Sequence, residues 1–265
     1  MMVEKMPGLR GGDVNAFSYE LTGAIGQKAC LGLLVLQSDE TIEHDFRRLM
    51  PVDNVSLYVS RVPSALEVSG ETLKTMEAHL PASAGLLPRS LAFDVVGYGC
   101  TSGTSVIGPA RIADLVGLGC QTRAVTEPVS ALLAACGALG VGRMAFLSPY
   151  VEEVSATLRI VLAGGGLETA VFGSFNEAEE AKVARIGPQS LIDAAVRLGS
   201  APDADVVFLS CTNLRTLDVI DEIEARTGKP VLSSNQVLAW HMARLSGAGP
   251  LRMRAGALTA LVEGE

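Results

Sequence analysis

The sequence repeats a strand-and-loop pattern at an offset of 111 residues. Residues 94–101 read DVVGYGCT and residues 205–212 read DVVFLSCT. Each run begins with aspartate, continues with apolar residues and ends in cysteine followed by threonine, which places Cys100 and Cys211 at matching positions. Such internal self-similarity predicts two copies of one structural unit.

A second pair of segments obeys the same offset. The apolar run at residues 31–36 maps onto residues 142–147, and Asp39 then falls opposite Tyr150. Apolar runs of this length, bounded by polar residues, are typical of buried strands in a parallel sheet.

A third pair of strands is expected at residues 123–126 and 230–233. Helical segments are expected to alternate with the strands at residues 41–48, 129–139, 152–163 and 237–245. This alternation predicts an α/β fold of two pseudo-symmetric flavodoxin-like or Rossmann-like halves, with parallel sheets and an active-site cleft between them.

For the division of the chain, we expect residues 28–122 and 230–265 in the first lobe and residues 123–229 in the second. In open parallel sheets, ligands bind beyond the carboxyl ends of the strands. Asp39, Cys100, Tyr150 and Cys211 all follow such ends. A duplication without any site between the halves is the plain structural alternative.

Composition limits the classes of partner. A net charge of −8 over 265 residues, without any run of Lys or Arg, disfavours nucleic acid and anionic membranes. The longest apolar stretch, residues 131–141, is shorter than the ~20 residues of a membrane-spanning helix. Residues 1–20 form no continuous apolar signal segment, so we expect a cytoplasmic protein. A homodimer or higher homo-oligomer is left open.

The five cysteines divide into two groups. They form no C-x-x-C pair and have no histidine at metal spacing, so we expect neither a structural metal nor a disulfide framework. Cys30, Cys120 and Cys136 lie in apolar or glycine-rich surroundings and suit structural roles. Cys100 and Cys211 differ because each follows an apolar strand and precedes polar residues.

The loops after Cys100 and Cys211 suit thiol chemistry beside a carboxylate. If a helix begins at these positions, its N-terminus lowers a thiol pKa and attracts anions. Neutral donors in the same loops can hold a carboxylate while it gains enediolate character. These donors are Thr101, Ser102, Thr212 and Asn213.

Two thiols on opposite faces of one carbon support racemisation or cis-trans isomerisation, since one removes or adds while the other completes the step. One thiol alone suffices for decarboxylation. No cofactor is expected: residues 97–103 read GYGCTSG, in which the third glycine falls one position late for a dinucleotide-binding G-x-G-x-x-G.

Taken together, these segments resemble the aspartate/glutamate racemase superfamily, and within it the branch of maleate cis-trans isomerases and arylmalonate decarboxylases. The resemblance spans about residues 30–245. It rests on five segments in this order: GLLVLQSDETIE at 32–43, CTS at 100–102, SPY at 148–150, CTN at 211–213, and SSNQ at 233–236 leading to Trp240.

The resemblance implies roles for these residues. Cys100 would add to the double bond of a maleate-like substrate and leave after bond rotation, while Cys211 exchanges the proton. Tyr150 would donate to a substrate carboxylate, in a pocket lined by the loop donors. The decarboxylases of this branch have glycine at the position of Cys100, which favours isomerase or racemase chemistry here.

Asp39 departs from the isomerase pattern, which has asparagine at this position. An ionised aspartate repels a carboxylate that asparagine would bind. The Gln37–Thr41 segment resembles the ectoine-utilisation branch, which implies a nitrogen-bearing substrate such as an amino acid. Alternatively, Asp39 only caps the helix near Thr41. An arylmalonate decarboxylase-like lyase and a non-catalytic accessory protein of ectoine catabolism also remain alternatives.

Overall fold

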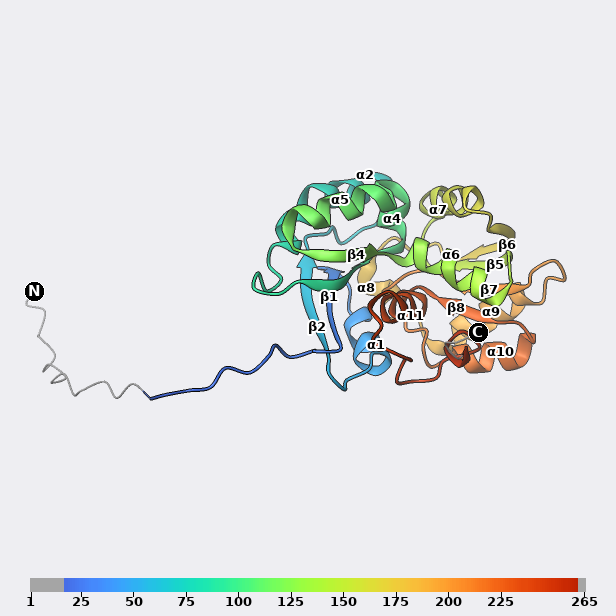
Figure 1. The fold of residues 1–265 in the computed structure, drawn as a ribbon. Coiled ribbons are helices and arrows are strands. Elements are labelled where there is room, and N and C mark those ends of the chain that lie inside the picture. Colours follow the sequence, from blue (N-terminus) through green and yellow to red (C-terminus); the bar gives the residue numbers. More distant parts are fainter. Residues whose placement is uncertain (1–16, 262–265) are drawn as a thin grey trace, which may run out of the picture.

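The computed structural model describes residues 17–261. The chain forms two four-stranded parallel sheets side by side (Figure 1). Their strand orders are β2-β1-β3-β4 and β6-β5-β7-β8, so the two sheets have the same topology. The expected α/β duplication is confirmed.

The first sheet and the helices that follow its strands occupy the N-terminal half of the chain. Its strands are β1 (Ala29–Leu36), β2 (Val55–Val62), β3 (Phe93–Gly99) and β4 (Thr122–Thr126). The helical elements are α1 (Ile42–Leu49), α2 (Gly70–Thr75), η1 (Met76–His79), α3 (Leu80–Ala84), α4 (Thr101–Ile107), α5 (Pro109–Gly119) and α6 (Pro128–Leu139).

The second sheet repeats this order. Its strands are β5 (Arg143–Ser148), β6 (Glu168–Ser174), β7 (Val206–Leu209) and β8 (Val231–Ser233). The helical elements are α7 (Glu152–Gly164), α8 (Glu180–Val183), α9 (Pro188–Gly199), α10 (Ile220–Thr227), α11 (Ser234–Ser246) and η2 (Leu258–Ala260). Helix α11 begins three residues before its expected start because Ser233 and Gln236 form a capping box.

The strand pairing corrects the offset of the first repeat pair. Leu33 pairs with Gly97 in the first sheet, and Phe146 pairs with Phe208 in the second. The second strands keep the offset of 111, but the first strands are therefore related by 113 residues. The repeated aspartates show the same relation, since Asp94 accepts a hydrogen bond from the Cys30 N–H (2.9 Å) and Asp205 from the Arg143 N–H (2.7 Å).

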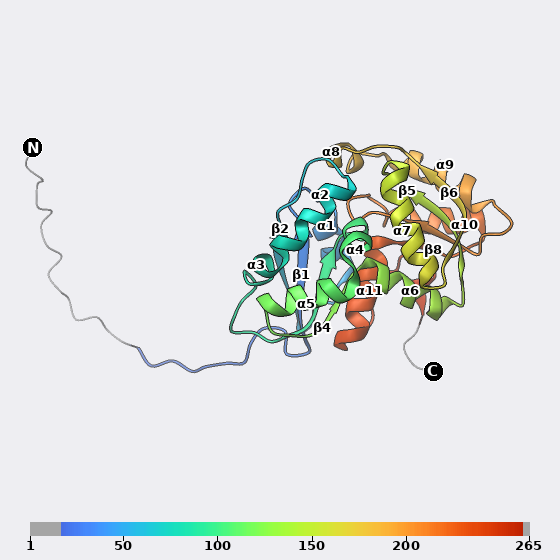
Figure 2. The ribbon, with the colours of Figure 1, turned by 90° about the horizontal axis from the view of Figure 1, so that it is seen from above.

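Helices α6 and α11 pass between the two halves. Although α6 follows β4 of the first sheet, its apolar residues pack with Met144 and Phe146 of the second. Helix α11 follows β8 of the second sheet but packs against β3 and α1 of the first (Figure 2). Its opposite side, which includes Trp240, joins the core of the second half. The two halves thus share their last helices.

This exchange differs from the lobes expected from the sequence. Strand β4 pairs with β3, so residues 122–126 lie in the first sheet rather than in the lobe 123–229. Strand β8 pairs with β7, so residues 231–233 lie in the second sheet rather than with the first lobe. The placement of these two strands is corrected because the crossing occurs after each strand, at the helix. Between residues 17 and 261, no helix combines the length and apolar character needed to cross a bilayer.

Candidate active site

A closed cavity lies where the carboxyl ends of β1, β3, β5 and β7 converge. Ten residues line it: Leu36, Asp39, Leu73, Cys100, Thr101, Ser102, Tyr150, Glu180, Cys211 and Thr212. The two cysteines from the two repeats therefore face one space. The volume that admits a water-sized sphere is about 10 Å³, which is room for about one water. A four-carbon acid needs the cavity to open.

Two segments join the halves beside this cavity. Glu67 and Glu179 form an antiparallel bridge, in which the Val68 N–H donates to the Ala178 carbonyl (3.1 Å) and the Glu180 N–H donates to the Leu66 carbonyl (3.1 Å). These segments follow β2 and β6, which are equivalent strands of the two sheets. Movement of this pair would change access to the site.

Cys100 begins helix α4. Its sulfur accepts a hydrogen bond from the Gly103 N–H at 3.1 Å, so the thiol caps the helix. Gly103 is required at this point, because a Cβ there would lie 2.9 Å from the Cys100 sulfur and 2.6 Å from the Tyr98 hydroxyl. The helix, its cap and the glycine together fix the thiol against the cavity.

Cys211 is held differently from Cys100. Its loop forms turns rather than a helix, and α10 begins only at Ile220, so the expected helix N-terminus beside Cys211 is wrong. The residue has a φ of +125°, which L residues rarely adopt. The Cys211 N–H donates to the Ser234 hydroxyl (3.0 Å), and its sulfur accepts from the Asn213 N–H (3.3 Å). These contacts keep the strained backbone in place.

Both thiols are more protonated than the sequence suggests. Burial is the main cause, raising the pKa of Cys100 to about 12 and that of Cys211 well above its ordinary value. The carboxylates of Glu180 and Asp39 raise both pKa values further. The expectation of a lowered thiol pKa is therefore wrong for this closed state, because desolvation outweighs the single backbone donor at each sulfur.

Glu180 is a site residue that the sequence analysis missed. It accepts hydrogen bonds from the Tyr150 hydroxyl (2.7 Å) and the Asn213 side-chain amide (2.7 Å), and it is 4% exposed. Burial raises its pKa, which the two donors partly offset. Glu180 lies in an acidic run with Glu177 and Glu179, and nothing in that run distinguishes it as the buried member.

The Tyr150 hydroxyl connects Glu180 to the second thiol. It lies 3.0 Å from the Cys211 sulfur while donating to Glu180. Its own pKa is raised well above the ordinary value by burial and by both neighbours. A proton can therefore pass between Cys211 and Glu180 along a continuous hydrogen-bonded path.

Asp39 both caps a helix and faces the cavity, so it fulfils both alternatives considered above. One carboxylate oxygen, Oδ1, accepts hydrogen bonds from the backbone N–H groups of Thr41 and Ile42, each at 2.8 Å. Within the described residues, the other oxygen, Oδ2, is buried without a hydrogen-bond partner. Burial raises the pKa of Asp39.

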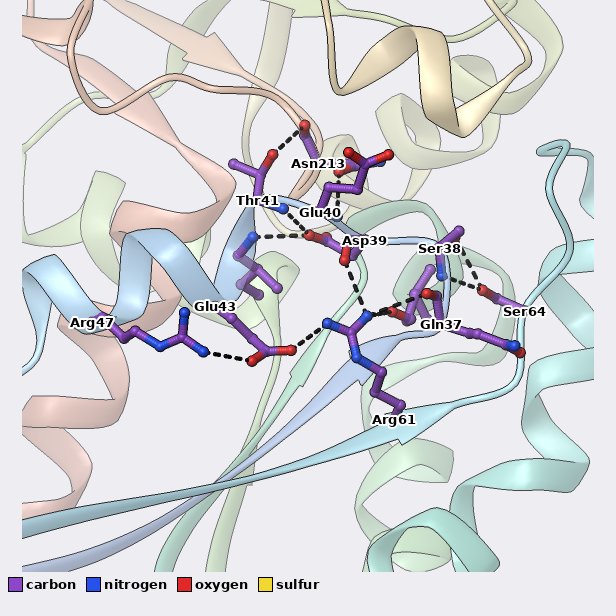
Figure 3. A network of polar contacts seen from close by, with 12 residues as sticks. Gln37, Ser38, Asp39, Glu40, Thr41, Glu43, Arg47, Arg61, Ser64 and Asn213 are labelled. Atoms are coloured by element: carbon purple, nitrogen blue, oxygen red, sulfur yellow. Dashed lines mark hydrogen bonds and ion pairs between the residues drawn. The ribbon is translucent and has the colours of Figure 1, made fainter.

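Arg61 fixes the loop that carries Asp39 (Figure 3). Its guanidinium donates to the carbonyl oxygens of Leu36 (2.9 Å) and Asp39 (3.0 Å) and pairs with Glu43. Figure 3 shows this guanidinium engaged with the loop backbone and with Glu43. Arg61 is not among the residues that line the cavity.

Ser234 ties the two cysteine loops together. Its hydroxyl accepts from the Cys211 N–H and also from the Thr101 hydroxyl at 2.8 Å. Ser234 is fully buried at the start of α11. The helix shared between the halves thus supplies the atom that joins the two repeats at the site.

The remaining predicted residues divide between the cavity and its support. Thr101, Ser102 and Thr212 line the cavity, as expected. Asn213 does not: its side chain donates to Glu180 and accepts from the Glu40 N–H at 2.9 Å. Its amide is therefore used within the protein. Among the described residues, no group of three or more His, Cys, Asp or Glu side chains is placed to hold a metal ion.

Comparison with known proteins identifies similar sequences. Residues 107–259 match the sequence model of the arylmalonate decarboxylase (Amdase) family. Arylmalonate decarboxylase of Bordetella bronchiseptica is 36% identical over 137 residues, which cover 51% of this chain and 55% of that enzyme. The match thus spans about half the length of that relative. Maleate isomerase of Geobacillus stearothermophilus is 25% identical over 77% of this chain and 86% of that protein.

A solved structure has the same fold. A cysteine-to-serine mutant of Nocardia farcinica maleate cis-trans isomerase, with a covalently bound succinylcysteine intermediate, superposes with a TM-score of 0.77. It is 22% identical, and the alignment covers 87% of this chain and 98% of that one.

Proposed function

Because the chain belongs to the arylmalonate decarboxylase family, we propose that it is a cofactor-independent isomerase or racemase that uses Cys100 and Cys211 on one small carboxylate substrate. The observation that carries this proposal is the cavity shared by the two thiols, one from each repeat. Two acid/base or nucleophilic groups on one bound molecule allow addition on one side and proton transfer on another.

For a maleate-type substrate the steps balance without a cofactor. The Cys100 thiolate adds to one alkene carbon, and the electron pair moves toward the neighbouring carboxylate. The Cys211 thiol then protonates the other carbon, which leaves a single bond free to rotate. Cys211 removes a proton from this carbon, the double bond re-forms, and the Cys100 sulfur leaves as thiolate. The covalent succinylcysteine in the structural relative supports this course.

Tyr150 and Glu180 suit the proton bookkeeping at Cys211. When Cys211 gives up its proton, Tyr150 can donate to the resulting thiolate, and Glu180 holds the tyrosine in place from the other side. The hydroxyls of Thr101, Ser102 and Thr212 supply neutral donors for a substrate carboxylate.

Decarboxylation is the weaker candidate for this chain. The decarboxylases in the resemblance have glycine at the position of Cys100, whereas here that position holds a thiol fixed by Gly103. A second thiol is not needed for decarboxylation, but it is needed for chemistry on two sides of one carbon or one bond. Racemisation of an amino acid uses the same two thiols and remains the second candidate because of Asp39.

The test is turnover in deuterated water, followed by proton NMR. Purified protein is incubated with maleate and with a set of L-amino acids. Appearance of fumarate, or deuterium at the α-carbon of an amino acid with formation of its D-form, supports the proposal. Release of carbon dioxide as the sole reaction contradicts it. The Cys120→Ser variant serves as control, since Cys120 lies outside the cavity residues.

A further inference from the structure

We propose that Asp39, assisted by Glu180, forms a subsite for a positively charged nitrogen. The substrate would then carry one carboxylate and one ammonium group, rather than the two carboxylates of maleate. This inference rests on the proposed two-thiol chemistry and names the class of acid on which it acts.

The first support is the unused oxygen of Asp39. Its Oδ1 is already occupied by two backbone donors, whereas Oδ2 has no partner within the described residues although Asp39 is only 4% exposed. The Thr212 hydroxyl is nearby and lowers the Asp39 pKa, but it donates to the Gly99 carbonyl at 3.3 Å. A buried carboxylate oxygen without a donor is costly, and a ligand N–H group would satisfy it.

The second support is the charge of the cavity wall. Asp39 and Glu180 both line the cavity, and each raises the pKa of both cysteines, so their fields reach the reacting groups. None of the ten lining residues is Lys, Arg or His. A dianion entering this space would meet two carboxyl groups and no cation.

The neighbouring cations are engaged elsewhere. Arg61 donates to backbone carbonyls of the loop and pairs with Glu43. Arg185 pairs with Glu40, with contacts of 2.8 and 3.0 Å. Both side chains are largely exposed and lie outside the cavity lining. Neither can balance a second substrate carboxylate inside the cavity as it stands.

The remaining lining groups suit a single carboxylate. Thr101 and Ser102 lie beside Cys100, and Thr212 lies beside Cys211. Within residues 17–261, the Ser102 hydroxyl makes no hydrogen bond, so it is available as a donor. Neutral donors next to the thiols and carboxyl groups at Asp39 and Glu180 give the cavity two chemically different ends.

The competing explanation is that Asp39 is protonated and donates to a second carboxylate, as an asparagine would. The two explanations predict opposite effects of Asp39→Asn. Asparagine keeps the size and a donor but cannot neutralise an ammonium group. If Asp39 binds nitrogen, the substitution weakens ammonium-bearing ligands and strengthens dianions. If Asp39 acts as a neutral donor, the substitution leaves the preference unchanged.

The experiment compares four-carbon probes by isothermal titration calorimetry on the full chain. Maleate is the dianion, and cis-4-aminobut-2-enoate and L-2-aminobutyrate each carry one carboxylate and one ammonium group. We expect at least one ammonium-bearing probe to bind tenfold or more tightly than maleate. Asp39→Asn should reverse that order. Asp53→Asn, an exposed change of the same charge, should leave it unchanged.

Tighter binding of maleate to the unmodified protein, or the same preference in Asp39→Asn, overturns the subsite. The Cys100→Ser and Cys211→Ser variants separate this from the proposed function. If they retain full turnover, the two-thiol proposal fails even where the ammonium preference holds. If turnover is lost while maleate is preferred, only the subsite fails. Circular dichroism of Asp39→Asn confirms that the helix α1 cap still folds.

Discussion

The Tyr150 hydroxyl lies 3.0 Å from the sulfur of Cys211 and donates to Glu180. The other thiol also has a tyrosine beside it, since the Tyr98 hydroxyl lowers the pKa of Cys100. Tyr98, however, reaches the Met76 sulfur at 3.7 Å rather than a carboxylate. The duplication thus places a thiol and a phenol in each half, but only the second half couples them to a buried acid.

This coupling predicts a specific effect of Tyr150→Phe. Loss of the hydroxyl removes the donor to a Cys211 thiolate and leaves Glu180 with one donor fewer. We expect kcat to fall by about 10²-fold or more, in line with the loss of a positioned acid/base partner. Steady-state kinetics across pH, on whichever acid the turnover assay identifies, measures it.

Tyr58→Phe is the matched control, because Tyr58 packs edge-on against Phe93 and lies outside the cavity lining. Its kcat and pH profile should match those of the unmodified protein. An unchanged kcat in Tyr150→Phe would remove Tyr150 from the proton path.

The positive φ of Cys211 predicts an unusual order of stability. At +125° a Cβ is unfavourable, so Cys211→Gly should be more stable than Cys211→Ala by about 1 kcal/mol. Both variants lose the thiol, so the comparison isolates the backbone. At Cys136, within helix α6, the order should reverse, because Gly in a helix costs about 1 kcal/mol relative to Ala.

Urea unfolding of the four variants gives these differences directly. Equal stability of the two Cys211 variants would show that the backbone is not strained at this residue.

Gly103 is expected to tolerate no side chain. A Cβ there would lie 2.6 Å from the Tyr98 hydroxyl, 2.9 Å from the Cys100 sulfur and 2.9 Å from the Met76 methyl carbon. Gly103→Ala should therefore lower stability by about 1–3 kcal/mol, as overpacking does, and displace the thiol. Gly137→Ala, in α6 with nothing within 4 Å, should instead raise stability by about 0.5–1 kcal/mol. Thermal unfolding separates the two, and a neutral Gly103→Ala would contradict the close packing around Cys100.

The raised thiol pKa predicts how alkylation depends on pH. A thiol with a pKa of about 12 is almost entirely protonated at pH 8, and its thiolate fraction rises as the pH rises toward 12. The rate of Cys100 modification by iodoacetamide should therefore still increase between about pH 9 and pH 11. In denaturant, the same thiol should level off near pH 9. Peptide mass spectrometry follows each cysteine, and a plateau below pH 9 in the folded protein would show that the site favours thiolate.

Much of the fold was predictable because both repeats mark their own strands. The Asp-Val-Val start, the apolar run and the terminal Cys-Thr are local features, and they place β3, β7 and the two thiols without any long-range information. The crossing of α6 and α11 was not predictable in the same way. Both helices are apolar on more than one side, so their sequences fit either sheet.

The site shows the same division. Asp39 and Tyr150 follow from their positions after strands, whereas Glu180 lies beyond β6 in a loop whose acidic residues look equivalent in sequence. Only the bridge between Glu67 and Glu179 turns Glu180 inward. The thiol pKa was misjudged for a related reason: the sequence indicates helix starts, but not how completely the two halves close over the sulfurs.

The central claim is that Cys100 and Cys211 act together on one substrate. Its most direct test is kcat for Cys100→Ser, Cys211→Ser and Cys120→Ser on the acid that the unmodified protein interconverts. Serine nearly preserves size but cannot act as a thiolate. We predict that kcat falls by 10³-fold or more in each of the first two variants and stays within twofold in the third. Full turnover in either Cys100→Ser or Cys211→Ser would contradict the account.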